Sequence, residues 1–128
     1  MKLFTLDEAN HLIPKVADKL KEMQQLYSTI AIYRESARAA AGASEFGGGM
    51  EGGSRYVQVL YQVGKITTEI HELGVQLKDY SRGLIDFPSM MDDRIVLLCW
   101  QLGEEESIEW WHEIEEGFDG RQRIPDHH

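Results

Sequence analysis

Apolar residues recur at alternating steps of four and three through the first part of the chain, which indicates a helix with one narrow apolar seam. Thr5 and Glu8 form a capping box at its start, in which each side chain binds a backbone N–H of the other residue. Pro14 lies inside the pattern and predicts a kink or a short first helix near His11, because proline removes a backbone donor. The pattern predicts a helix over residues 5–40, with a seam of the coiled-coil kind formed by Ala9, Ile13, Val16, Leu20, Met23, Tyr27 and Ile30.

A second run with the same spacing predicts a second long helix, whose seam consists of Val59, Val63, Ile66, Ile70, Leu73 and Leu77. Ser54 is expected to cap this helix. Gly64 interrupts it and indicates the close approach of a neighbouring helix, and Gly74 predicts its C-terminal stop. The stretch between the helices, GASEFGGGMEGGS over residues 42–54, holds six glycines and predicts a flexible connection.

The two helices are expected to form an antiparallel hairpin over about residues 5–78. Two helices alone cannot cover both seams, so the hairpin needs either the C-terminal segment or a second copy of itself. We therefore expect a homodimer or a higher homo-oligomer.

The apolar pattern then changes to a period of two. Residues 83–87 are expected to form a short strand that ends at Pro88, and residues 94–102 a central strand that is apolar on both faces. Residues 107–114 alternate as well, and their aromatic content favours a third strand over a helix. Residues 117–128 are expected to be an irregular tail. The predicted fold is a single α+β domain, 1–128, with a long antiparallel helical hairpin followed by a small antiparallel three-stranded β-meander.

Composition narrows the classes of partner. The chain has 128 residues and a formal net charge of −9, so nucleic acid is not an expected partner, because phosphate binding needs clustered Lys and Arg. No run approaches the roughly 20 apolar residues of a membrane span, and the N-terminus does not look like a secretory signal. With the single Cys99, which has no intrachain disulfide partner, these features predict a cytoplasmic protein that binds neither membrane nor nucleic acid.

Histidine and carboxylates in the C-terminal half form the most suggestive set of polar residues. His112, Asp86 and Glu104 lie near the ends of the predicted strands, and the strand breaks are expected to bring them together. Glu72 of the second helix is the fourth candidate ligand. Histidine with carboxylates is a ligand set for a divalent metal such as zinc, iron or manganese. Arg121 from the tail is the alternative partner for the same cluster. A third possibility is that His112 only hydrogen-bonds a nearby carboxylate or backbone carbonyl at the sheet edge.

Other residues with reactive or aromatic side chains favour structural roles. Cys99 lies in the middle of an apolar strand with no basic neighbour in the sequence, so it is expected to be a small buried hydrophobe and not a nucleophile. Trp100, Trp110 and Trp111 are expected to be core anchors. The sequence has no phosphate-binding loop, zinc-protease motif or nucleophile elbow.

Several separated motifs resemble one bacterial family. GLIDFP, LCWQLGE, IEWWHE and GFDGR are similar to the C-terminal signature of the family known as domain of unknown function 2203, and FTLDEANHLIP is similar to its N-terminal signature. The resemblance covers nearly the whole chain. It implies no activity, but it points to the positions that carry the family pattern, which are Asp86, Trp100, Glu104, His112 and Arg121.

Two functional hypotheses follow from these patterns. The first is a non-enzymatic, self-associating protein that binds a partner or a small ligand through its C-terminal sheet. The alternative is a metal-dependent, hydrolase-like enzyme with His112, Asp86, Glu104 and Glu72 around a divalent ion.

Overall fold

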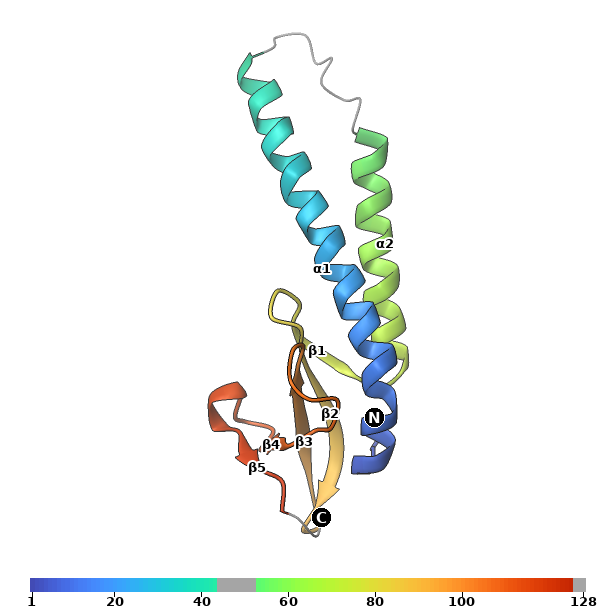
Figure 1. Ribbon diagram of the computed structural model, residues 1–128, viewed down its shortest axis with the longest axis vertical. Coiled ribbons are helices and arrows are strands. Elements are labelled where there is room, and N and C mark those ends of the chain that lie inside the picture. Colours follow the sequence, from blue (N-terminus) through green and yellow to red (C-terminus); the bar gives the residue numbers. More distant parts are fainter. Residues whose placement is uncertain (44–52, 126–128) are drawn as a thin grey trace.

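The computed structural model describes residues 1–43 and 53–125 and shows two packed helices followed by an open five-stranded antiparallel sheet (Figure 1). The helices are α1 (Leu6–Ala43) and α2 (Gly53–Glu72). The C-terminal half of α1 and the N-terminal half of α2 project beyond the sheet (Figure 1). No helix in the described part of the chain is both long and apolar enough to cross a membrane.

The predicted capping box opens α1. The Thr5 backbone N–H donates to Oε1 of Glu8 at 2.8 Å, and the Glu8 N–H donates to Oγ1 of Thr5 at 3.1 Å. Pro14 does not break the helix, so the prediction of a short first helix was wrong. Proline leaves only one carbonyl without its helical donor, and the flanking Ile13 and Val16 are fully buried, which holds both turns in place.

Both predicted seams belong to the hydrophobic core, apart from Tyr27 of the first and Leu73 and Leu77 of the second, which are half-buried. Leu77 lies in a strand and not in α2, because the helix already ends at Glu72. Gly74 follows in the left-handed region at φ 89°, as expected of a helix C-terminal stop. At the other end, α2 begins at Gly53, before the expected cap at Ser54. The predicted connection overlaps the ends of both helices, and its residues 44–52 lie outside the described residues.

The sheet has five strands where three were predicted. They follow one another in space in chain order as β1 (Gln76–Asp79), β2 (Leu84–Met91), β3 (Arg94–Gln101), β4 (Trp110–His112) and β5 (Gln122–Arg123). The three expected strands correspond to β2, β3 and β4, and β3 is central as predicted. The strands that were not predicted, β1 and β5, are edge strands of four and two residues, which are too short to show an alternating pattern. β5 lies within the segment that was expected to be an irregular tail.

Pro88 lies inside β2 and does not end it, which corrects the predicted strand end. β1 pairs with β2 only as far as Asp86, and beyond it no strand of the described residues pairs with this edge of β2. The Pro88 carbonyl points to this edge and accepts the Phe4 N–H at 2.8 Å. The Pro88 nitrogen points to the same side. It has no hydrogen to donate, but no neighbouring strand of the described chain would accept one there, and edge positions of this kind tolerate proline.

The two faces of the sheet have different neighbours. Residues opposite one another on adjacent strands share a face, and the rows Ile85–Trp100 and Phe87–Leu98–Trp111 belong to the hydrophobic core that contains the helix seams. The alternate residues therefore lie on the outer face, away from α1 and α2. This outer face carries the polar residues of the candidate site.

Candidate metal-binding site

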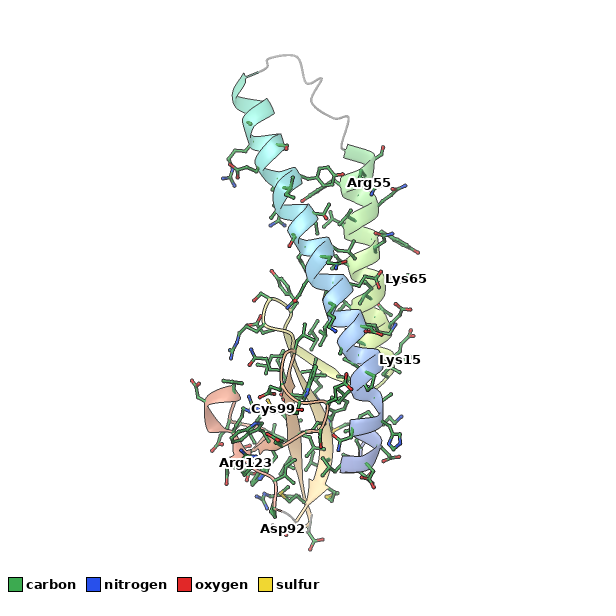
Figure 2. The ribbon with its side chains drawn as sticks, viewed as in Figure 1. Lys15, Arg55, Lys65, Asp92, Cys99 and Arg123 are labelled. Carbon is green, nitrogen blue, oxygen red and sulfur yellow. The ribbon has the colours of Figure 1, made fainter. Side chains whose placement is uncertain are left out.

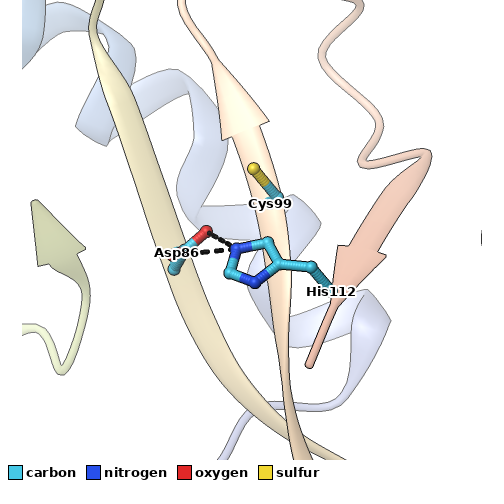
Figure 3. Close-up of side chains that lie close together, drawn as sticks. All are labelled: Asp86, Cys99 and His112. Atoms are coloured by element: carbon cyan, nitrogen blue, oxygen red, sulfur yellow. Dashed lines mark hydrogen bonds and ion pairs between the residues drawn. The ribbon is translucent and has the colours of Figure 1, made fainter. Parts of the chain in front are cut away.

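A tight turn sets the register that builds the site. Asp92 and Asp93 connect β2 to β3 with φ angles of 49° and 63°, the left-handed pair that a two-residue type I′ turn requires. Counting outward from this turn places Asp86 directly opposite Cys99. β4 then pairs with the other edge of β3 and places His112 opposite Leu97, so that His112 lies on the same face (Figure 3).

Asp86, Cys99 and His112 converge beneath the surface. Nε2 of His112 lies 3.1 Å from Oδ1 and 3.2 Å from Oδ2 of Asp86, reaching across β3 (Figure 3). One potential ligand atom from each of the three residues lies within 4.8 Å of the others. Their exposed fractions are only 2%, 1% and 3%. In the described residues this is the group of histidine, cysteine and acidic side chains that is arranged to surround one ion.

The hydrogen bonds of the imidazole define what must lie between His112 and Asp86. Nδ1 is 2.8 Å from the carbonyl oxygen of Glu113. A carbonyl only accepts, so Nδ1 carries a hydrogen and donates it. In a neutral ring Nε2 is then a bare acceptor, and it faces a carboxylate that is also an acceptor when ionised. A proton shared by the pair, or another cation, has to occupy this contact.

Burial governs the protonation of the other two groups. It raises the pKa of Asp86, and the charge and hydrogen bond of His112 offset part of that rise. Burial also raises the pKa of the Cys99 thiol to about 12, with a further contribution from the negative charge of Asp86. The metal-free protein therefore keeps Cys99 as a neutral thiol at neutral pH, in agreement with the inert cysteine predicted from the sequence.

The protonated, buried Cys99 should be inert toward alkylation in the folded state, because the thiolate is the reactive form. Iodoacetamide added to the native protein near neutral pH is expected to leave Cys99 unmodified, whereas the same reagent should modify it fully in denaturant. Mass spectrometry over time measures both rates. Equal rates in the two conditions would contradict the burial and the raised thiol pKa.

A second polar cluster lies beside the first on the outer face. Nη2 of Arg121 donates to Oε2 of Glu104 at 2.6 Å, and Oε1 of Glu104 accepts the Gln101 N–H at 2.7 Å. The guanidinium packs over the rings of Trp110 at 4.8 Å and Phe118 at 4.5 Å. The Arg121 side chain is only 8% exposed, and its Nε has no hydrogen-bond partner within the described chain.

Trp110 differs from the two other tryptophans. Trp100 and Trp111 belong to the core, as predicted. Trp110 lies half-buried on the outer face, where the guanidinium groups of Arg121 and Arg123 each lie 4.8 Å from its ring. The prediction that Trp110 anchors the core was therefore wrong, because β4 alternates and turns it away from the helices.

The structure brings together some of the predicted site residues and separates others. Asp86 and His112 meet as expected. Glu104 pairs with Arg121 and is not part of the three-residue group. Glu72 lies at the end of α2, in a groove of that helix, and does not join the group either.

Sequence reasoning treated Cys99 as a buried hydrophobe and missed it as a ligand candidate. The signal was present in the Asp92–Asp93 pair. A two-residue turn there fixes the register of the hairpin and places Asp86 opposite Cys99.

Comparisons with known proteins agree with the sequence motifs. A family model described as "Uncharacterized conserved protein (DUF2203)" matches residues 2–124. Neither the curated proteins nor the solved structures gave a match. The site geometry is therefore the basis for an argument about function.

Proposed function

The chain belongs to the DUF2203 family, which is uncharacterized, and from its site we propose that the protein is a non-enzymatic binding protein whose sheet holds one divalent transition-metal ion between Asp86, Cys99 and His112. One observation carries the proposal. Nε2 of His112 faces both oxygens of Asp86 at 3.1 and 3.2 Å while Nδ1 is committed to the Glu113 carbonyl. The contact requires a shared proton or a metal cation, and the sulfur of Cys99 beside it, which favours a metal, supplies a third potential ligand.

The donor set suits zinc. Zinc binds nitrogen, sulfur and oxygen at about 2.0–2.3 Å with tetrahedral geometry. His112 offers one nitrogen, Cys99 one sulfur, and Asp86 two oxygens at nearly equal distances from the imidazole. The two oxygens of one carboxylate subtend too narrow an angle to fill two corners of a tetrahedron, so the three side chains supply three of the four tetrahedral positions. A thiolate among the ligands favours zinc over magnesium or calcium, which prefer oxygen alone.

The burial of these three side chains supports a metal site enclosed by protein over a catalytic, hydrolase-like site that is open to substrate. Catalytic zinc keeps a coordination position open to water and substrate, whereas structural zinc is enclosed by protein ligands. None of the three side chains is more than 3% exposed. An ion held here would tie β2, β3 and β4 together beneath the surface, and this supports a binding or structural role for the metal.

Binding of a metal ion at this site should displace protons from its ligands, and this release can be measured. With its pKa of about 12, the Cys99 thiol must lose its proton to the solvent before sulfur binds the ion. The proton shared by Asp86 and His112 is displaced as well. The apparent affinity is therefore expected to rise with pH, and binding should release protons.

Calorimetric titration of the chelator-treated full chain with zinc chloride tests the proposal. His127 and His128 of the sequence are replaced by alanine in every sample, because they can bind zinc themselves. We expect one ion per chain and a higher melting temperature with zinc. Cys99→Ser and His112→Ala should each lower the affinity at least tenfold, since each removes one ligand.

His71→Ala is the matched control, because His71 is an exposed histidine on α2 that takes no part in the group. It should leave zinc binding unchanged. Absence of zinc binding would overturn the proposal, as would binding that Cys99→Ser leaves intact. Cys99→Ser keeps the size of the side chain, so loss of binding in a variant that still melts cooperatively reports on the ligand and not on folding.

A further inference from the structure

Nothing in the described part of the chain explains a glycine in the middle of α2. Gly64 lies far from both ends of the helix, where glycine is unfavourable compared with alanine. A Cβ added at Gly64 would meet nothing within 4 Å. The sequence indicated that Gly64 marks the close approach of a neighbouring helix, and the described chain places no helix there.

Exposed apolar side chains precede Gly64 along one face of α2. Val57, Leu60 and Tyr61 are 63%, 42% and 73% exposed. With Gly64 they follow the spacing i, i+3, i+4, i+7 of one helix face. We call these four residues the outer α2 face. It is distinct from the buried seam of Val59, Val63, Ile66 and Ile70, which packs inside the molecule.

The outer α2 face is also hollowed. Tyr61, Gly64, Lys65 and Thr68 line an open groove along the helix, together with Glu69 and Glu72. Figure 2 shows Lys65 on the side of α2 that faces away from α1. A groove beside a glycine, next to exposed aliphatic and aromatic side chains, fits the side chains of a second helix.

We propose that this face binds the same face of a second copy of the chain, with the two α2 helices antiparallel. Tyr61 and Gly64 are three residues apart on one face, so an antiparallel pair related by a two-fold axis can place Tyr61 of each copy over Gly64 of the other. The ring fills the space that the missing side chain leaves, and the contact is made twice. Two hairpins joined in this way would place four helices side by side, through a face other than the seams, which the single chain already buries.

A second copy can approach this face because helix α2 carries no net charge. The whole chain carries −9, which makes two copies repel. Helix α2 is neutral, because its two basic residues, Arg55 and Lys65, balance Glu69 and Glu72. Two molecules can therefore approach through α2 with less repulsion than through the acidic segment around residues 104–119.

The same register matches charges at the ends of the pair. With Tyr61 opposite Gly64, Glu72 of one copy falls opposite Gly53 of the other, at the N-terminus of its α2. The first turn of α2 contains no acidic residue of its own. A carboxylate from the second copy would be stabilised by the positive end of that helix dipole.

Light scattering and sedimentation of the full chain test the proposal. The parent protein is expected to have twice the mass of one 14.7 kDa chain at micromolar concentration and to dissociate on dilution. Gly64→Gln fills the groove, and Tyr61→Glu places a charge in the contact. Each should weaken association at least tenfold. Since a Cβ at residue 64 meets nothing in the single chain, the Gly64→Gln monomer should melt no lower than the parent monomer.

Gly117→Gln is the matched control, because Gly117 lies outside α2 and a Cβ there also meets nothing within 4 Å. It should leave the dimer unchanged. A parent protein that stays monomeric as its concentration rises overturns the proposal, whether or not another protein binds this face. A dimer that withstands both Gly64→Gln and Tyr61→Glu overturns it equally, because its interface then lies elsewhere.

Discussion

Truncation of Trp100 to alanine is expected to lower the free energy of unfolding by about 3–5 kcal/mol, as truncation of a buried aromatic side chain does. Trp100 is 2% exposed and lies on the central strand, on the face that packs against the helices. Its Nε1–H also donates to the Glu105 carbonyl at 2.7 Å. The change therefore leaves a cavity and an unpaired carbonyl in one step.

Chemical denaturation followed by circular dichroism measures this effect, with two variants for comparison. Trp100→Phe keeps most of the packing and loses the hydrogen bond, so its loss should be markedly smaller. Trp110→Ala removes the same side chain from a half-buried position on the outer face, and we expect a smaller loss there too. Similar midpoints for Trp100→Ala and the parent would mean that the helices do not cover this face of β3.

Replacement of Asp86 by alanine should be about as damaging, at about 3–5 kcal/mol, because removal of one partner from a buried pair leaves the other polar group uncompensated. His112 is 3% exposed, and Nε2 would face a void. Asp86→Asn is the matched variant. Its amide can donate to Nε2 without placing a charge in the interior, so its stability should stay within about 1 kcal/mol of the parent.

The pH dependence separates these two Asp86 variants further. Burial raises the pKa of Asp86 in the folded state, so below the pKa of the unfolded chain its contribution to stability is fully present. The contribution is lost as the pH rises through the folded pKa. Asp86→Asn lacks this loss. In chelator-treated samples its stability relative to the parent should therefore increase from about pH 4 upward.

Denaturation midpoints of Asp86→Asn and the parent across that range check the sign. A parent protein that gains stability over Asp86→Asn as the pH rises would show that the carboxylate is favoured in the folded state. The proton would then reside on His112, and the pair would be an ion pair. Equal losses for Asp86→Ala and Asp86→Asn would instead show that the charge itself is needed.

The helices were predictable because long amphipathic patterns accumulate signal over many residues. The capping box at Thr5 and Glu8 and the stop at Gly74 rest on local backbone chemistry, and both were found as predicted. Pro14 was misread because its effect depends on how firmly the flanking turns are packed. Leu77 was misread because it continues the helical spacing by chance after the chain has already left α2.

The site was partly predictable for a similar reason. Asp86 and His112 stand near strand breaks that bring neighbouring strands together, so their meeting followed from the order of the elements. Glu72 was wrongly placed in the cluster because nothing in the sequence says on which side of the sheet the end of α2 lies. Placing Cys99 in the site required the exact register of the β2–β3 hairpin, because a shift of one residue would turn Cys99 to the other face of the sheet.

The hydrogen bond between Phe4 and Pro88 and the bond that Ser89 donates to the Phe4 carbonyl join the start of the chain to β2. During synthesis the first residues emerge long before their partners exist, since about 84 residues separate the two segments. The helical hairpin can form early from nearby contacts, but its sheet-facing side stays uncovered until β2 and β3 arrive. During that interval the apolar seam of α1 is exposed. A nascent or truncated chain that ends before β2 would therefore present the kind of apolar surface that chaperones bind.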